Sequence, residues 1–338
     1  MVRMEGQNAK NMGGRKQIVI FLVLVAPIVY VLSGSNKGEP VIEGSVAFKK
    51  RLSSYHLFQG EMSAMNPSVG VELFELSSTL FTDYAEKQRL IRLPEGKKMK
   101  LTENGLPVFP EGTLIAKTFY YPSKTGRKTR MVDTRLLIYE RLKWNVATYR
   151  WNKEQTDAVL LENGATVELE IEDPSGKPKQ LAYRIPSSKE CVSCHRSGSE
   201  LLAIGPKVMN LNRIVERGGK RLNQLEYLMN KGLFESRSLD SFKRMPAYTD
   251  SKLPIQQRAR AYMDINCAHC HRPGGNAGHT MLVLDYGIGL ESSGILRNKN
   301  NIIIRMSEMG DYHMPKLGTT VIDTGGVELV KSYLKNIK

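Results

Sequence analysis

The sequence predicts an α+β protein of several domains, in which a β-rich N-terminal region precedes two mostly helical segments. Three observations support this fold class. Short alternating apolar runs separated by turn residues fill the stretch from 55 to 187. The pentapeptide Cys-x-x-Cys-His occurs twice in the second half of the chain, at 191–195 and 267–271. Apolar residues recur at helical spacing just before the second pentapeptide and again at the C-terminus.

Length and charge narrow the possibilities before any motif is considered. The 338 residues give room for two or three domains, and an apolar content of 41% is ordinary for a globular protein. The formal net charge is +15. Such a charge suits nucleic acid, anionic lipid headgroups or an acidic protein partner. Because the sequence has no helix-turn-helix, zinc-finger or RNA-binding signature, we expect no nucleic-acid partner.

The first 35 residues have the pattern of a signal peptide or a membrane anchor. A basic stretch precedes an apolar run from 18 to 32. This run is short for a transmembrane helix and typical of a signal peptide. The residues after it form a mediocre cleavage site, and Ser35 stands where a lipoprotein would carry its cysteine. A cleaved signal and an uncleaved anchor both stay open, and in either case the rest of the chain is exported.

Turn residues divide the stretch from 55 to 187 into short runs that are typical of strands. The clearest runs are 113–120, 134–140, 145–151, 165–171 and 180–185. This pattern predicts a β-rich domain, either a small sandwich or a meander. Its aromatic residues Trp144, Tyr149 and Trp151 are typical of core positions rather than of a ligand site.

Each pentapeptide is the attachment signature of a c-type haem. Its two thiols lie three positions apart and can add to the two vinyl groups of one porphyrin, and the His that follows can bind the iron. The first motif supplies Cys191, Cys194 and His195, and the second supplies Cys267, Cys270 and His271. Together the motifs use all four cysteines of the chain. We therefore expect two covalently bound haem c groups with iron ligands His195 and His271.

Three other uses of paired cysteines fit the sequence less well. Compact zinc ribbons separate their pairs by about 15–20 residues, and the spacing between Cys194 and Cys267 is far longer. A thioredoxin-like redox pair belongs to a βαβ pattern, which neither motif follows. Two structural disulfides are the third alternative. None of the three needs a histidine after each second cysteine.

The first haem segment, from 188 to 252, departs from the usual order of a class I cytochrome c, because its motif follows a predicted strand. Gly205-Pro206 comes after the motif, where a Pro carbonyl would accept the N–H of the iron-binding histidine. A basic amphipathic stretch with helical spacing runs from 211 to 229. The basic residues of this segment form either a solvated face or a docking surface for an acidic redox partner.

The second haem segment, from 253 to 338, matches a class I cytochrome c more closely. An amphipathic helix is predicted over 256–266 and leads directly into the motif. A C-terminal helix is predicted over 326–337. The first and last helices cross in this class of cytochrome, and Tyr262 and Tyr333 are suitable contact residues.

Methionine opposite the iron-binding His raises the reduction potential, a second His lowers it, and an open position permits catalysis. For the second haem we expect Met314 as the sixth ligand, because Met314-Pro315 lies in a loop before the last helix. The other candidates are Met306, which ranks next, Met281, Met309 and His313.

The dipeptide Met245-Pro246 repeats the same signature after the first motif. We therefore expect Met245 as the sixth ligand of the first haem. Met209 and Met229 compete with it, although both lie at helical positions where Met usually fills a core. His269, inside the second motif, is expected at the surface, with a smaller chance of contacting the other haem.

Several further stretches carry a family resemblance. They are 81–87, 149–152 with 155–158, 205–207 with 211–212, and 258–262 leading to 266–271. On these residues the chain resembles a largely uncharacterised family of bacterial dihaem c-type cytochromes, from about residue 60 to the C-terminus. The resemblance implies two haems and an exported location. It also implies that the polar tract 151–158 matters more than its composition indicates.

These patterns favour a dihaem cytochrome that transfers single electrons between periplasmic or membrane redox partners with acidic docking surfaces. We expect it in the bacterial periplasm, anchored to the inner membrane by 18–32 if the leader is not cleaved. The alternative is a dihaem peroxidase-like enzyme, or another haem oxidoreductase with an open iron position at the first haem. A haem-binding sensor or scaffold is the third hypothesis. The sixth ligand of the first haem distinguishes a carrier from an enzyme.

Overall fold

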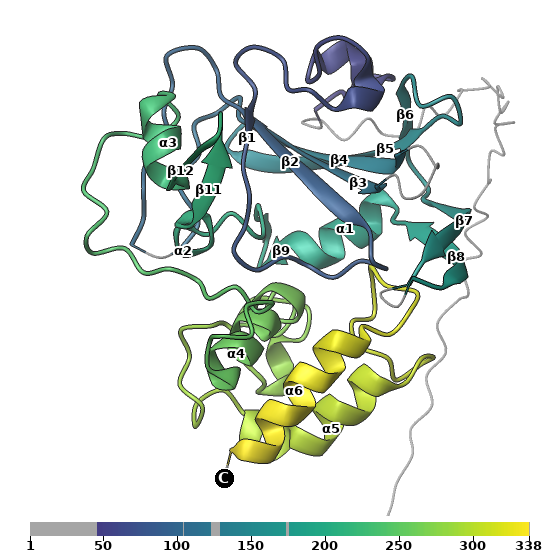
Figure 1. The fold of residues 1–338 in the computed structure, drawn as a ribbon, viewed down its shortest axis with the longest axis vertical. Coiled ribbons are helices and arrows are strands. Elements are labelled where there is room, and N and C mark those ends of the chain that lie inside the picture. The colour runs from purple at the N-terminus through teal and green to yellow at the C-terminus, as the bar shows by residue number, and fades with distance from the viewer. Residues whose placement is uncertain (1–45, 104, 123–128, 174–175, 338) are drawn as a thin grey trace, which may run out of the picture. The chain divides into compact units, whose positions relative to one another are not determined.

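The computed structural model describes residues 46–103, 105–122, 129–173 and 176–337 (Figure 1). The predicted signal or anchor at 1–35 lies outside these ranges. Within them, no helix is both long enough and apolar enough to cross a membrane.

A six-stranded antiparallel sheet forms the N-terminal part of the described chain. Its strands are β1 (Glu72–Leu73), β2 (Glu86–Arg92), β3 (Leu114–Tyr121), β4 (Arg130–Glu140), β5 (Lys143–Trp151) and β6 (Ala158–Leu161). Each strand pairs with the next one along the chain, which makes the sheet a meander. The predicted β-rich region is therefore confirmed.

The remaining strands form three separate two-stranded hairpins. They are β7 (Ala165–Glu172) with β8 (Pro178–Ile185), β9 (Arg196–Ser197) with β10 (Glu200–Leu201), and β11 (Ile214–Arg217) with β12 (Lys220–Asn223). The helices are α1 (Ser188–His195), α2 (Val208–Leu211), α3 (Gln224–Asn230), α4 (Ile255–Asn266), α5 (Ile295–Ser307) and α6 (Thr324–Asn336), with 3₁₀ helices η1 (Leu52–Tyr55), η2 (Met62–Ala64) and η3 (Gly278–Thr280). The chain is therefore mixed α+β, with a more helical C-terminal region after the sheet.

Different apolar clusters cover the two faces of the sheet, because successive side chains of a strand point to opposite faces. On one face, Leu136 and Tyr149 pack with residues of η1 and η2. On the other face, Ile115 and Leu137 pack with residues of α2 and α3. Figure 1 shows α1 on this second face and the 3₁₀ helices on the first. The core thus continues from the sheet into residues 188–252, across the expected domain boundary at 187.

The basic stretch from 211 to 229 is not one helix, contrary to the sequence prediction. It contains the hairpin β11–β12 followed by most of α3. Gly218 and Gly219 join the two strands with φ angles of 56° and 73°. Two consecutive residues at positive φ are what a tight hairpin turn requires, and glycine adopts them without steric cost. The apolar residues at helical spacing therefore belong to separate elements.

Helices α4 and α6 pack together in the C-terminal region, as predicted for the first and last helices. Tyr262 and Tyr333 are both buried in the apolar cluster that the two helices share. The hydroxyl of Tyr262 donates to the Asp323 carboxylate over 3.0 Å, and that carboxylate accepts from the Gly326 amide at the start of α6. A Cβ at Gly326 would overlap the Tyr262 hydroxyl. The close contact between the helices therefore requires glycine at this position.

The loop before β2 joins the β-rich region to the C-terminal helices. The buried Asp83 carboxylate accepts hydrogen bonds from the amide (2.7 Å) and hydroxyl (2.8 Å) of Thr320 and from the amide of Val321. The Phe81 amide donates to the side-chain oxygen of Asn266 over 2.7 Å. The loop between α5 and α6 is thereby held against the β-rich region.

Candidate cofactor site

The first Cys-x-x-Cys-His motif lies on α1, which begins directly after β8. Ser187 and Glu190 form a capping box at its start: the Ser187 hydroxyl accepts from the Glu190 amide, and the Glu190 carboxylate accepts from the Ser187 amide. Cys191 is buried, and its Sγ lies 3.6 Å from the Thr148 hydroxyl on β5. The motif is therefore held directly against the sheet.

His195 is oriented by the backbone of the hairpin that follows it. Its Nδ1 lies 2.7 Å from the carbonyl oxygen of Leu202. Since a carbonyl can only accept, Nδ1 carries the proton and Nε2 keeps its lone pair. Burial is the main influence that lowers the pKa of His195, to about 4, so the ring is neutral at pH 7.

The acceptor for His195 corrects the prediction that the Pro206 carbonyl would fill this role. The chain after the motif folds back at once through the β9–β10 hairpin. This brings Leu202 beside His195, and the Leu202 amide also donates to the His195 carbonyl over 2.8 Å. The predicted kind of interaction is therefore present, but with a residue nearer in sequence.

The second motif follows α4, as predicted, and forms a turn. Nδ1 of His271 lies 3.3 Å from the Thr280 hydroxyl of η3. Burial is the main cause that lowers the pKa of His271. Burial also raises the pKa of the Cys267 thiol to about 12. All four cysteines are free thiols.

The two motifs meet in space. The Cys194 and Cys270 thiols line the same cavity, and their interaction lowers the pKa of Cys270 while it raises the pKa of Cys194. Next to it, the Asn276 side chain donates to the Ser193 carbonyl over 2.7 Å. The sequence did not predict this contact, because nothing in either pentapeptide specifies a partner so distant along the chain.

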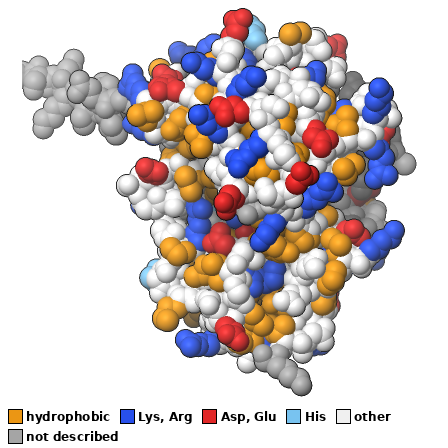
Figure 2. Space-filling view, turned by 90° about the vertical axis from the view of Figure 1, so that its left-hand side faces the viewer, with side chains coloured by type: hydrophobic (Ala, Val, Ile, Leu, Met, Phe, Trp, Pro, Cys, Tyr) orange, Lys and Arg blue, Asp and Glu red, His pale blue; other side chains and the backbone are white. Residues whose placement is uncertain are grey.

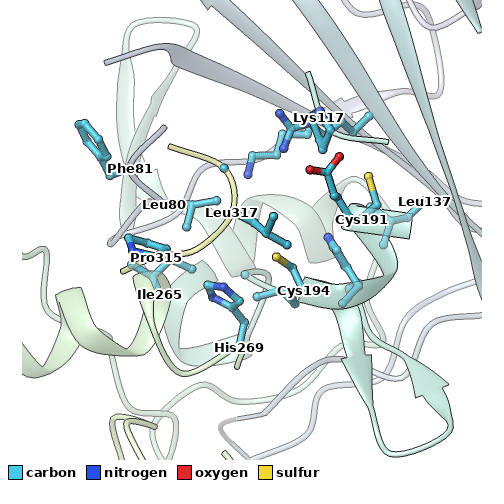
Figure 3. A pocket seen from close by; sticks show the side chains of 18 of the residues that line it. Leu80, Phe81, Lys117, Leu137, Cys191, Cys194, Ile265, His269, Pro315 and Leu317 are labelled. Atoms are coloured by element: carbon cyan, nitrogen blue, oxygen red, sulfur yellow. The ribbon is translucent and has the colours of Figure 1, made fainter. Parts of the chain in front are cut away.

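A cavity lies beside each motif. Cavity one has a volume of about 280 Å³ and is lined by Cys191, Cys194 and His195 (Figure 3). Cavity two has a volume of about 380 Å³ and is lined by Cys267, Cys270 and His271. Cys194 and His269 line both cavities. His269 is thus buried between the motifs, whereas the sequence placed it at the surface.

The expected sixth ligands differ in where they lie. Met314 and Met306 both line cavity two. Met245 does not line cavity one; its side chain is buried in a small apolar cluster with Met209 and Ala261. Among the described residues, no methionine lines cavity one. The structure therefore brings Met314 close to its motif and does not bring Met245 close to His195.

Three cations of the sheet line cavity one and were missed by the sequence reasoning. They are Arg89 on β2, Lys117 on β3 and Arg135 on β4. The strands that carry Lys117 and Arg135 contain many apolar residues, so those two runs look like ordinary core strands. The sequence feature that could have revealed these cations is a charged residue at a strand position that faces the core. Charged residues are rarely buried without a partner, so such a position suggests a ligand.

The tract 151–158 lies at the sheet edge and lines neither cavity. The Asp157 carboxylate accepts from the amide (3.1 Å) and the hydroxyl (2.8 Å) of Ser53 and pairs with Arg51. Burial opposes ionisation of Asp157, but the hydrogen bonds outweigh it and lower its pKa. The tract therefore fixes η1 to the sheet edge.

No protein-family model, curated protein or solved structure matches the chain. Within the described ranges, no group of three or more His, Cys, Asp or Glu side chains is arranged to hold a metal ion.

Proposed function

We propose that the chain is an exported dihaem c-type cytochrome that transfers single electrons between redox partner proteins. The observation that carries this proposal is the meeting of the two Cys-x-x-Cys-His motifs. Each motif borders its own cavity, and the second cysteines of the two motifs, Cys194 and Cys270, contact one another. Two motifs without a shared function would not be expected to lie next to one another in the fold.

The residues beside each cavity fit a covalently bound haem. Four free thiols are available. His195 and His271 each have Nδ1 next to an oxygen atom, which is the arrangement that orients a metal-binding imidazole and raises its basicity. When bound, haem supplies an iron that changes oxidation state by one electron. Met314 and Met306 line the same cavity as His271, so either thioether would be available as a second ligand to an iron bound there.

The contact between Cys194 and Cys270 bears on electron transfer. Thioether bonds would join each of these residues to the edge of its porphyrin. Because Cys194 and Cys270 are neighbours, haems attached to them would lie near one another, which would favour electron exchange between the two haems. His269 is buried and lines both cavities beside this contact.

One observation favours a second function, a haem oxidoreductase with an open iron position at the first haem. Cavity one has no methionine among its described lining residues. Its polar side chains include His269 and Lys117. A haem held by His195 without a sixth protein ligand could bind a small substrate, as in a peroxidase-like enzyme.

Carbon monoxide binding to the ferrous protein distinguishes the two functions. The carrier predicts two reversible one-electron couples and no carbon monoxide adduct. One equivalent of bound carbon monoxide per two haems would support the oxidoreductase instead. A protein without any redox couple would contradict both.

We also propose a periplasmic location, with acidic redox proteins as partners. The net charge of +15 supports such partners. Figure 2 shows Lys and Arg side chains interspersed with Asp and Glu on one face rather than gathered into one patch. Fractionation tests the anchor at 18–32: a soluble periplasmic protein would mean that the leader is cleaved.

A further inference from the structure

A row of three cations crosses the sheet at the face that carries α1. Arg89 on β2 stands directly opposite Lys117 on β3, and Lys117 stands directly opposite Arg135 on β4. The next residue in the row, on β5, is Thr148, which contacts Cys191. Like charges directly opposite one another on antiparallel strands are destabilising. The row therefore needs negative charge nearby.

Only one cation of the row has a counter-ion among the described residues. The Arg135 guanidinium pairs with the buried Asp133 carboxylate over 2.7 Å, and the Tyr183 hydroxyl donates to the same carboxylate. No ion pair joins Arg89 or Lys117 to a described carboxylate. Among the described residues, neither Arg89 nor Lys117 therefore has an ion-pair partner.

Arg89 is buried and Lys117 is half-buried. Arg89 is 7% exposed, and its Nη2 has no hydrogen-bond partner although water cannot reach it. Burial lowers the pKa of Lys117 well below its usual value, and the charges of Arg89 and Arg135 lower it further. Its ammonium lies 4.7 Å from the centre of the Phe119 ring. Burying unpaired charge is costly, so the arrangement indicates a ligand that supplies the missing anions.

The row faces the cavity beside the first motif. Arg89, Lys117 and Arg135 line cavity one together with Cys191 and His195. In Figure 3, Lys117 lies across the cavity from His269. A group attached to Cys191 and Cys194 would therefore share this cavity with the unpaired cations.

We propose that Arg89 and Lys117 bind the propionate carboxylates of the haem held by Cys191, Cys194 and His195. This proposal rests on the proposed function. A haem carries two propionates, which matches the two unpaired cations in number and charge. Charge-assisted hydrogen bonds from a guanidinium and an ammonium to carboxylates are among the strongest that a protein forms. Arg135 contributes less, because Asp133 already neutralises it.

The test uses the variants Lys117→Leu and Arg89→Leu in the full chain with haem attached. Resonance Raman spectra should show a shift in the propionate bending bands of one haem. The reduction potential of that haem should fall, because removing a positive charge stabilises its ferric form, while the other potential stays fixed. Lys143→Leu removes an exposed charge from the same sheet and should change neither haem. Lys117→Arg keeps the charge and should restore the potential.

Other outcomes overturn the proposal. Unchanged bands and potentials in variants that keep two haems would show that the row does not hold propionates. A potential that depends on phosphate concentration would assign the row to a free anion. Loss of a low-spin iron spectrum in Lys117→Leu would assign Lys117 to the iron itself.

If Lys117→Leu does not fold, Lys117→Gln provides the same comparison. A wild-type protein with fewer than two haems would contradict the proposed function rather than this inference.

Discussion

The same pentapeptide occurs in two different surroundings in this protein. Cavity one lies against a β-sheet and is lined by the cations Arg89, Lys117 and Arg135, with no methionine among its described lining residues. Cavity two is lined by residues of α4 and α5 and of the loop before α6, and Met306 and Met314 are among them. The comparison teaches that the motif specifies only attachment and one iron ligand. The methionines and charges beside each motif come from tertiary structure, so the two proposed haems would differ in potential.

The methionines provide the largest test of this comparison. Met314→Ala should lower the potential of one haem by on the order of 0.1 V, because axial ligands set potentials over a range of roughly 0.8 V. The thioether favours ferrous iron, so its loss stabilises the ferric form. Potentiometric titration followed by visible spectroscopy measures both potentials. If both potentials are unchanged, Met314 is not a ligand.

Met245→Ala is the matched control, since Met245 belongs to the other Met-Pro dipeptide. Its side chain is buried away from cavity one. The variant should leave both potentials unchanged and lower the free energy of unfolding by about 2–5 kcal/mol, as for other buried methionines. A potential lowered by this variant would make Met245 an iron ligand and would reverse the contrast between the cavities.

Asp83 tests whether the β-rich region holds the loop that borders both cavities. Asp83→Ala leaves the hydrogen-bond donors of Thr320 and Val321 without their acceptor, which should cost about 3 kcal/mol in denaturant unfolding. It should also speed proteolysis between α5 and α6. If unfolding and proteolysis match those of the wild type, the loop does not depend on this carboxylate.

The pH dependence of Asp83 gives a second measurement. Burial is the main influence on this carboxyl and raises its pKa, although hydrogen bonds from Thr320 oppose the rise. For an acid with a raised folded pKa, the contribution to stability is fully present below the ordinary pKa and is lost as pH rises through the folded value. As the pH rises from the ordinary pKa of an aspartate to the raised pKa of Asp83, the free energy of unfolding of the wild type, measured with denaturant and compared with that of Asp83→Asn, should therefore decrease. An increase would contradict the stated direction of the shift.

Two adjacent glycines test the packing that supports cavity two. Gly326→Ala places a Cβ against the Tyr262 hydroxyl and should destabilise the protein by about 2 kcal/mol through overpacking. Gly325→Ala meets only an Asp323 oxygen at 3.7 Å. It should be neutral, or stabilising by about 0.5–1 kcal/mol, because alanine is the better helix former. Thermal unfolding of the two variants compares them directly, and equal effects would mean that α4 and α6 do not meet closely here.

Much of the fold could be predicted because it follows from local patterns. The alternating runs predicted β3, β4, β5, β7 and β8, and the amphipathic spacing predicted α4 and α6. The hairpin β11–β12 was missed, since its turn depends on two glycines inside an apolar pattern with helical spacing. Strand β2 and helix α5 were not among the predicted elements.

The candidate site could be predicted only where it is local. The six motif residues are contiguous in sequence and visible without a structure. The Leu202 acceptor depends on a two-stranded hairpin, and the contact of Cys194 with Cys270 depends on the packing of segments far apart in sequence. The cation row is visible only when the register of β2, β3 and β4 is known.

The number of haems per chain tests the central claim most directly. Intact mass and the pyridine haemochrome spectrum of the exported protein should give two haems per chain and no titratable thiol. Replacing Cys191 and Cys194 with serine should leave one haem, and so should replacing Cys267 and Cys270. A wild-type protein with one haem, or with none and four free thiols, would contradict the account.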